Sequence, residues 1–130
     1  MIILDANVLI AYGSRDDPHH DAAVSLLNEF AGQPFAASAV TRAEVLVHPV
    51  KKDTVSTALA GHEALELRFV DLRAEVALDL ARVRASTGLR LPDAVVVLLA
   101  RQLDGIIATF DAGLARGARS EGIPVVGDES

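Results

Sequence analysis

Four carboxylates lie in four separate segments of the chain, and their side chains are of the type that binds a divalent metal ion. They are Asp5, Glu44, Asp93 and Asp111, and the first and last directly follow short apolar runs. A carboxylate among apolar residues loses hydration, so it is unfavourable unless a positive group compensates for it. Hard cations such as Mg²⁺ take oxygen ligands of this kind. The four acids therefore predict a metal site if the fold brings them together.

Composition restricts the classes of protein that fit. The 130 residues suit a single domain, residues 1–130, and the absence of cysteine excludes disulfides and thiolate zinc sites. The net charge of −6 argues against a passive electrostatic nucleic-acid binder. The apolar run Ala94–Ala100 is far shorter than the ~20 residues of a membrane span, and no basic, signal-like segment precedes Asp5. We expect a cytoplasmic protein without a membrane partner.

Short, nearly continuous apolar runs predict strands that are buried on both faces, as in a parallel sheet. They are Ile2–Leu4, Phe35–Ala37, Leu67–Val70, Ile106–Ala108 and Ile123–Val126. The residues after the last run, 127–130, are expected to form a polar tail.

Helical patterns separate these runs. Helices are predicted over Asp21–Phe30, from near Ser38, over Val55–Glu63, over Leu72–Thr87 with Asp71 as N-cap and Gly88 as the stop, and from Pro92 to about Leu103. Strands that alternate with helices indicate an α/β fold, a three-layer α/β/α domain with a central parallel sheet of about five strands.

Chain direction indicates that the four acids meet. Ligands of open α/β sheets bind beyond the carboxyl ends of the strands, and Asp5 and Asp111 directly follow the first and fourth strands. The helix from Pro92 runs antiparallel to the strand it precedes, so Asp93 in its first turn lies at the same edge. Glu44 lies about two turns into its helix, a rise of ~10 Å, and can reach back over the edge. All four are expected to share one rim.

Each acid also has an ordinary structural explanation. Asp5 could cap a helix that starts at the next residue, and Asp93 could complement a helix dipole. Glu44 could be a solvated helix position, and Asp111 a turn residue or cap. The convergence of all four at one edge, and no single residue, favours the metal site.

With these residues in place, the chain resembles the PIN-domain nucleases, and most closely the small ribonuclease toxins of VapC-type toxin–antitoxin modules. The resemblance is carried by Ile3–Ile10, by Ser38–Glu44, by Leu91–Ala94 and by Ala108–Asp111. It implies a PIN-like fold and a metal-dependent endoribonuclease that hydrolyses RNA with Mg²⁺, Mn²⁺ being possible, to leave a 3′-hydroxyl and a 5′-phosphate. It also implies an antitoxin partner that covers the acidic pocket, and a homodimer.

The resemblance assigns roles to particular side chains. Asp5, Glu44, Asp93 and Asp111 would form the acidic metal site, and Asn7, Thr109, Ser38 and Thr41 would support it. Relatives often carry a further acid or polar group directly after the position of Asp111, where this chain has Ala112. One metal ion and two metal ions therefore both stay open.

Some questions stay open at the level of sequence. Arg15, Arg42, Arg90 and Arg116 lie near the site segments and could hold an RNA backbone or be solvated surface residues. The identity of the RNA is unassigned. The alternative function is a PIN-like domain that acts on another nucleic acid, or one retained as a non-catalytic RNA- or partner-binding module.

Two other enzyme or signalling classes fit less well. A haloacid-dehalogenase-type phosphohydrolase needs a second Asp where this chain has Asn7, and a receiver domain needs an acidic pair beside Asp5. The few aromatic residues are too scattered to predict a base-stacking platform, and Phe110 is expected to pack in the core. His19 and His20 are expected in a solvated loop.

Overall fold

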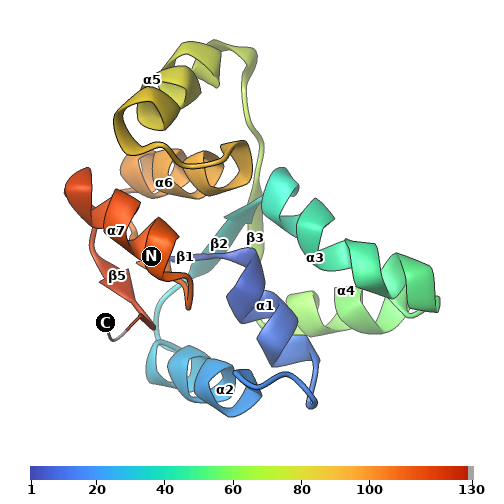
Figure 1. Cartoon of the computed structure of the whole chain (residues 1–130). Coiled ribbons are helices and arrows are strands. Elements are labelled where there is room, and N and C mark those ends of the chain that lie inside the picture. The colour runs from blue at the N-terminus through green and yellow to red at the C-terminus, as the bar shows by residue number, and fades with distance from the viewer. Residues whose placement is uncertain (129–130) are drawn as a thin grey trace.

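The chain folds into three layers around a parallel sheet, as the computed structural model shows for residues 1–128 (Figure 1). Residues 129 and 130 of the predicted tail lie outside the described part. The strands are β1 Ile2–Leu4, β2 Phe35–Ser38, β3 Arg68–Val70, β4 Ile106–Ala108 and β5 Val125–Val126, in the order β3-β2-β1-β4-β5. Every pairing is parallel. The predicted five-stranded parallel sheet is confirmed, with a shorter last strand.

Within residues 1–128, seven α-helices and one 3-10 turn cover the sheet. They are α1 Ala6–Gly13, α2 His20–Glu29, α3 Ala39–Lys52, α4 Val55–Ala64, the 3-10 turn η1 Ala74–Val76, α5 Ala77–Thr87, α6 Leu91–Leu103 and α7 Ala112–Ser120. The predicted helices near Ser38, over 55–63 and from Pro92 are confirmed within one or two residues at most boundaries.

The helix predicted over Leu72–Thr87 begins later than expected. Its first residues leave β3 in an extended conformation, and Arg73 still has φ −84° and ψ 154°. Asp71 is therefore not an N-cap, and that prediction is wrong. Gly88, at φ 74°, does end α5 as predicted, because glycine adopts the left-handed region without strain.

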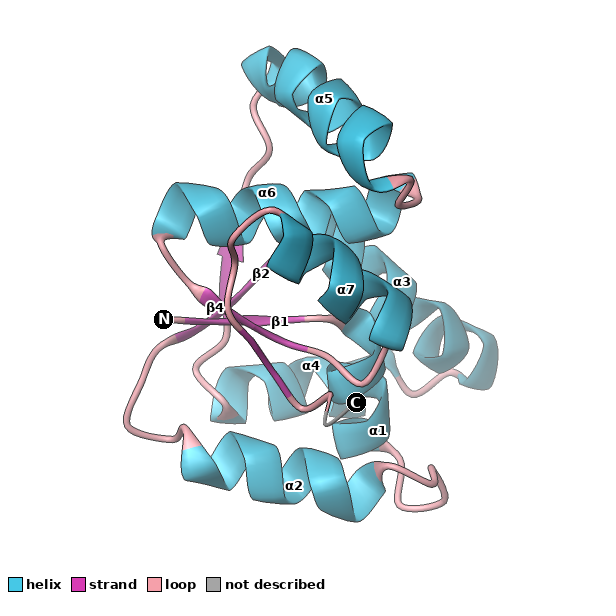
Figure 2. Cartoon of the chain, turned by 60° about the vertical axis from the view of Figure 1, so that its left-hand side comes forward, coloured by secondary structure: helices cyan, strands magenta, loops and turns pink. Residues whose placement is uncertain are grey.

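The two faces of the sheet carry separate halves of the core. Side chains alternate along a strand, so Ile2 and Leu4 pack with α1 and α2, whereas Ile3 packs with α5, α6 and α7. Figure 2 shows these helix layers on opposite sides of the strands. Residues 94–100 of α6 are all buried, as expected for a helix between the sheet and α5. The segments that follow β1 and β4 lead to helices on opposite faces of the sheet, and they meet at the carboxyl ends of these two strands.

Within residues 1–128, no helix is long and apolar enough to cross a membrane.

Candidate functional site at the carboxyl edge of the sheet

Asp5 is the buried centre of the candidate site. It directly follows β1, caps α1 and is only 6% exposed. Its Oδ1 accepts a hydrogen bond from the Ala6 N–H at 2.8 Å, and its Oδ2 accepts one from the Thr109 hydroxyl at 2.7 Å. Burial raises the pKa of Asp5 to about 6; the two hydrogen bonds oppose this shift, and repulsion by Asp93 and Asp111 adds to it. The structure thus confirms Asp5 as the N-cap of α1 and places it next to Thr109 at the end of β4.

Thr109 connects two segments of the site, the start of α1 and the loop after β4, through one hydroxyl group. It is fully buried at the end of β4. Its Oγ1 donates to Asp5, and it accepts hydrogen bonds from the Asp111 N–H at 3.0 Å and from Asn7 Nδ2 at 3.3 Å. Asn7 in turn accepts a hydrogen bond from the Phe110 N–H at 3.3 Å. The loop after β4 is therefore fastened to the first turn of α1.

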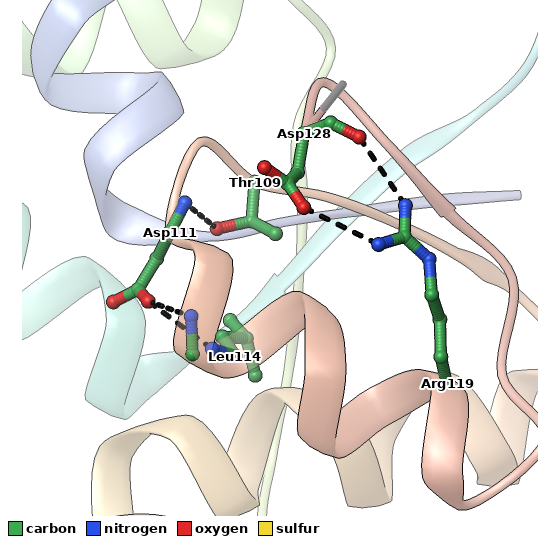
Figure 3. A network of polar contacts seen from close by, with 6 residues as sticks. Thr109, Asp111, Leu114, Arg119 and Asp128 are labelled. Carbon is green, nitrogen blue, oxygen red and sulfur yellow. Dashed lines mark hydrogen bonds and ion pairs between the residues drawn. The ribbon is translucent and has the colours of Figure 1, made fainter. Parts of the chain in front are cut away.

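Asp111 begins α7, a helix that the sequence analysis did not predict. Its Oδ1 accepts hydrogen bonds from the N–H groups of Gly113 at 2.8 Å and Leu114 at 3.1 Å (Figure 3). Such capping satisfies amide groups that the first turn of a helix leaves unpaired. Ala112 and Gly113, where relatives often carry a further acid or polar group, form the first residues of α7 in this chain.

Glu44 and Asp93 complete the acidic rim. The pKa of Asp93 is raised by burial and by Asp111, and the nearby Arg90 opposes the rise. Burial and Asp93 raise the pKa of the exposed Glu44, again against Arg90. Each of the four acids therefore interacts electrostatically with at least one of the others.

The acids lie near one another, but their side chains do not form a complete set of metal ligands. Among residues 1–128, no three acidic or histidine side chains are positioned to hold an ion. Both oxygens of Asp5 accept hydrogen bonds, and Asp111 directs one oxygen to the first turn of its own helix. Mg²⁺ typically retains several waters and needs only one or two direct carboxylates, so a donor set of this chemistry fits it.

The supporting residues take different positions. Ser38 and Thr41 are buried, and Ser38 caps α3 by accepting a hydrogen bond from the Thr41 N–H at 3.1 Å. They fix the start of the helix that carries Glu44. The guanidinium carbon of Arg42 lies 4.0 Å from the centre of the Phe69 ring.

One contact at the site was missed at the sequence level. The rings of His19 and Phe110 stack with centroids 5.0 Å apart and planes 15° apart. Phe110 also packs partly against the core, so its expected role is confirmed in part. A sequence signal for the pair is absent, because His19 and Phe110 come from loops on distant parts of the chain.

Comparison with known proteins assigns the chain to a family. A PIN domain model matches residues 2–120. The chain is 34% identical over 120 residues to Ribonuclease VapC29 of Mycobacterium tuberculosis, with 88% of each chain covered.

Solved structures share the fold at lower identity. A toxin–antitoxin complex from Klebsiella pneumoniae matches with a TM-score of 0.74 and 24% identity, covering 98% of this chain and 97% of that one. The Mycobacterium tuberculosis toxin VapC20, described as cleaving the sarcin–ricin loop, matches with a TM-score of 0.73 and 17% identity, covering 89% and 94%.

Proposed function

Since this chain belongs to the PIN-domain family, among its VapC-type ribonucleases, we propose that it is an endoribonuclease toxin that hydrolyses RNA phosphodiester bonds with bound Mg²⁺ or Mn²⁺. The observation that supports the proposal best is the grouping of acidic side chains at the carboxyl ends of β1 and β4. There the buried Asp5 shares an electrostatic environment with Asp93 and Asp111, and Asp93 with Glu44. Repulsion of this kind favours a cation, and a cation lets an acidic pocket accept a phosphate.

The four acids would have different roles in metal binding. Asp5, Asp93 and Glu44 would hold the first ion, directly or through water, and Asp111 would hold a second ion or orient the attacking water. When bound, the metal would lower the pKa of a water molecule and neutralise charge on the phosphate. The number of Mn²⁺ ions bound per chain distinguishes these two roles of Asp111, because two ions are expected if it holds a second metal and one if it orients the water.

The remaining polar groups keep the acids in place. The Thr109 hydroxyl fixes Oδ2 of Asp5, so that carboxylate cannot rotate freely. Asn7 fastens the loop that carries Asp111 to α1 through Thr109 and the Phe110 N–H. Residues that orient ligands in this way matter because small changes in ligand direction weaken metal binding and activity.

RNA cleavage by purified variants tests the proposal. Wild-type protein is expected to cleave RNA with Mg²⁺ or Mn²⁺ and not with chelator, and Asp5→Asn and Asp93→Asn should each lose cleavage. Asp104→Asn is the matched control: it makes the same change at the opposite end of α6, in a left-handed conformation that Asn tolerates. Equal rates in all variants would indicate a contaminating ribonuclease and contradict the proposal. Equally fast cleavage of single-stranded DNA would favour the other-nucleic-acid alternative.

An antitoxin is the proposed protein partner. The similar proteins include a toxin–antitoxin complex and VapBC2 of Rickettsia felis bound to a promoter DNA fragment, with a TM-score of 0.74. Expression of the chain in bacterial cytoplasm is expected to arrest growth, and co-expression of a small neighbouring gene should relieve the arrest. Asp5→Asn should abolish the arrest; arrest that persists in this variant would exclude catalysis as its cause.

A homodimer is proposed for the chain in solution. Light scattering coupled to size-exclusion chromatography measures its mass directly, and a mass equal to the 13.7 kDa chain at micromolar concentration would contradict it.

A further inference from the structure

The stacked pair of His19 and Phe110 lies beside the acidic site without a role in it. We propose that this pair, called here the ring platform, stacks on a nucleobase of the single-stranded RNA substrate next to the bond that is cleaved. The inference rests on the proposed ribonuclease function and adds to it a contact that selects how the RNA strand lies across the site.

The inner ring of the platform is tied to the site by covalent and hydrogen bonds. Phe110 stands between Thr109 and Asp111, and its N–H donates to Asn7 Oδ1 at 3.3 Å. Its side chain packs against the core on the α1 and α2 side of the sheet. A base held on this platform would therefore be held at a fixed position relative to the acids.

The outer ring is held in place and is still open to solvent. The His19 N–H donates to Asp17 Oδ1 at 2.8 Å, and His19 Nδ1 lies 3.8 Å from the same oxygen. The side chain of His19 remains 61% exposed although one ring face covers Phe110. The opposite ring face is accordingly available to a flat ligand.

The surroundings favour a base over a phosphate group. Asp16 and Asp17 lie three and two residues before the platform residue His19 in the loop that precedes α2, and carboxylates repel phosphate. The face of a nucleobase carries no net charge, and aromatic side chains stack on any base. The part of RNA that fits this surface is therefore an unpaired base.

A single tryptophan tests the contact directly. The chain has no Trp, so His19→Trp introduces the only one. In an Asp93→Asn background that prevents cleavage, an RNA oligonucleotide that the wild type cleaves should quench its fluorescence. The same oligonucleotide with one abasic nucleotide beside the cleaved bond should not. Asn28→Trp is the control, because exposed Asn28 lies at the end of α2 that leads to the opposite edge of the sheet.

Kinetics give a second, independent readout. His19→Ala is expected to raise KM for that RNA by about 5-fold to 100-fold with little change in kcat, the range that loss of one stacked base produces. His19→Phe keeps a ring and should restore KM, whereas Asn28→Ala should change nothing.

Several outcomes would overturn the platform. The first is an unchanged KM in His19→Ala. The second is fluorescence quenching that is the same wherever the abasic nucleotide is placed in the RNA. The third is quenching of the Trp by the antitoxin and not by RNA. If wild-type protein cleaves no RNA, the proposed function fails by itself. The fluorescence titration with single-stranded RNA still decides whether the platform binds a base.

Discussion

Asp5 is expected to make the stability of the metal-free protein depend on pH. Its pKa is about 6 in the folded chain against 3.8 for a solvated aspartate, so the folded state holds the proton more tightly than the unfolded state. The free energy of unfolding should therefore fall as pH rises through this window, by ~3 kcal/mol in total. Asp5→Asn should remove this component. Urea unfolding of the wild type and of Asp5→Asn between pH 4 and pH 7.5, in the presence of chelator, measures this component. The same pH dependence of the unfolding free energy in both proteins would contradict the prediction.

Thr109 is expected to matter for both stability and activity because its hydroxyl group has three partners. Thr109→Val keeps the shape but leaves the Asp111 N–H and Asn7 Nδ2 without this acceptor. Unfolding free energy should drop by ~1–3 kcal/mol, and kcat by about 10-fold to 100-fold. Thr109→Ser should restore most of both losses. A Val variant with wild-type kcat would show that Asp5 needs no orienting partner; exposed Thr57→Val serves as the control.

The short strand β5 has a larger part in the site than its two residues suggest. It ends at Val126, and the next residue, Gly127, has φ 96°; a Cβ at Gly127 would lie 2.6 Å from the carbonyl oxygen of Thr109. Gly127→Ala should therefore lower the unfolding free energy by ~1–3 kcal/mol and shift the end of β4, with a loss of activity. The matched Gly61→Ala change in α4 meets no atom within 4 Å and should be neutral or stabilising. Thermal melts measure the stability of the two variants. Equal melting temperatures would show that the backbone after β5 can shift to accept a Cβ at no cost in stability.

The complete set of acids is expected to couple metal binding to folding. An ion that binds only the folded chain stabilises it, by ~2.7 kcal/mol at a concentration of 100 times Kd. Mg²⁺ or Mn²⁺ should therefore raise the melting temperature of the wild type by several degrees, and much less in Asp93→Asn. NaCl at equal ionic strength is the control. An equal rise in both proteins would indicate a site elsewhere.

Much of the fold was readable from the chain because its signals are local. Buried parallel strands need continuous apolar runs, and the runs at 2–4 and 106–108 match β1 and β4 residue for residue. Chain direction predicts that Asp5, Asp93 and Asp111 share one edge, because a helix leading into a parallel strand begins near that strand's carboxyl end; Glu44 joins them only by the reach of its side chain. The local rules failed at Asp71, where the chain stays extended after β3, and at α7, which was overlooked although Asp111 was read as a possible cap.

The contacts between distant loops could not be read in this way. The hydrogen bond from Thr109 to Asp5, the close approach of Gly127 to Thr109 that leaves no room for a Cβ, and the stacking of His19 on Phe110 each join separate segments. Their formation depends on how the layers pack and on where each loop crosses the edge of the sheet, and no pattern within one segment encodes that. Residue types and order thus specify which acids can bind a metal, whereas packing specifies the hydroxyl group that orients Asp5 and the rings that stand beside it.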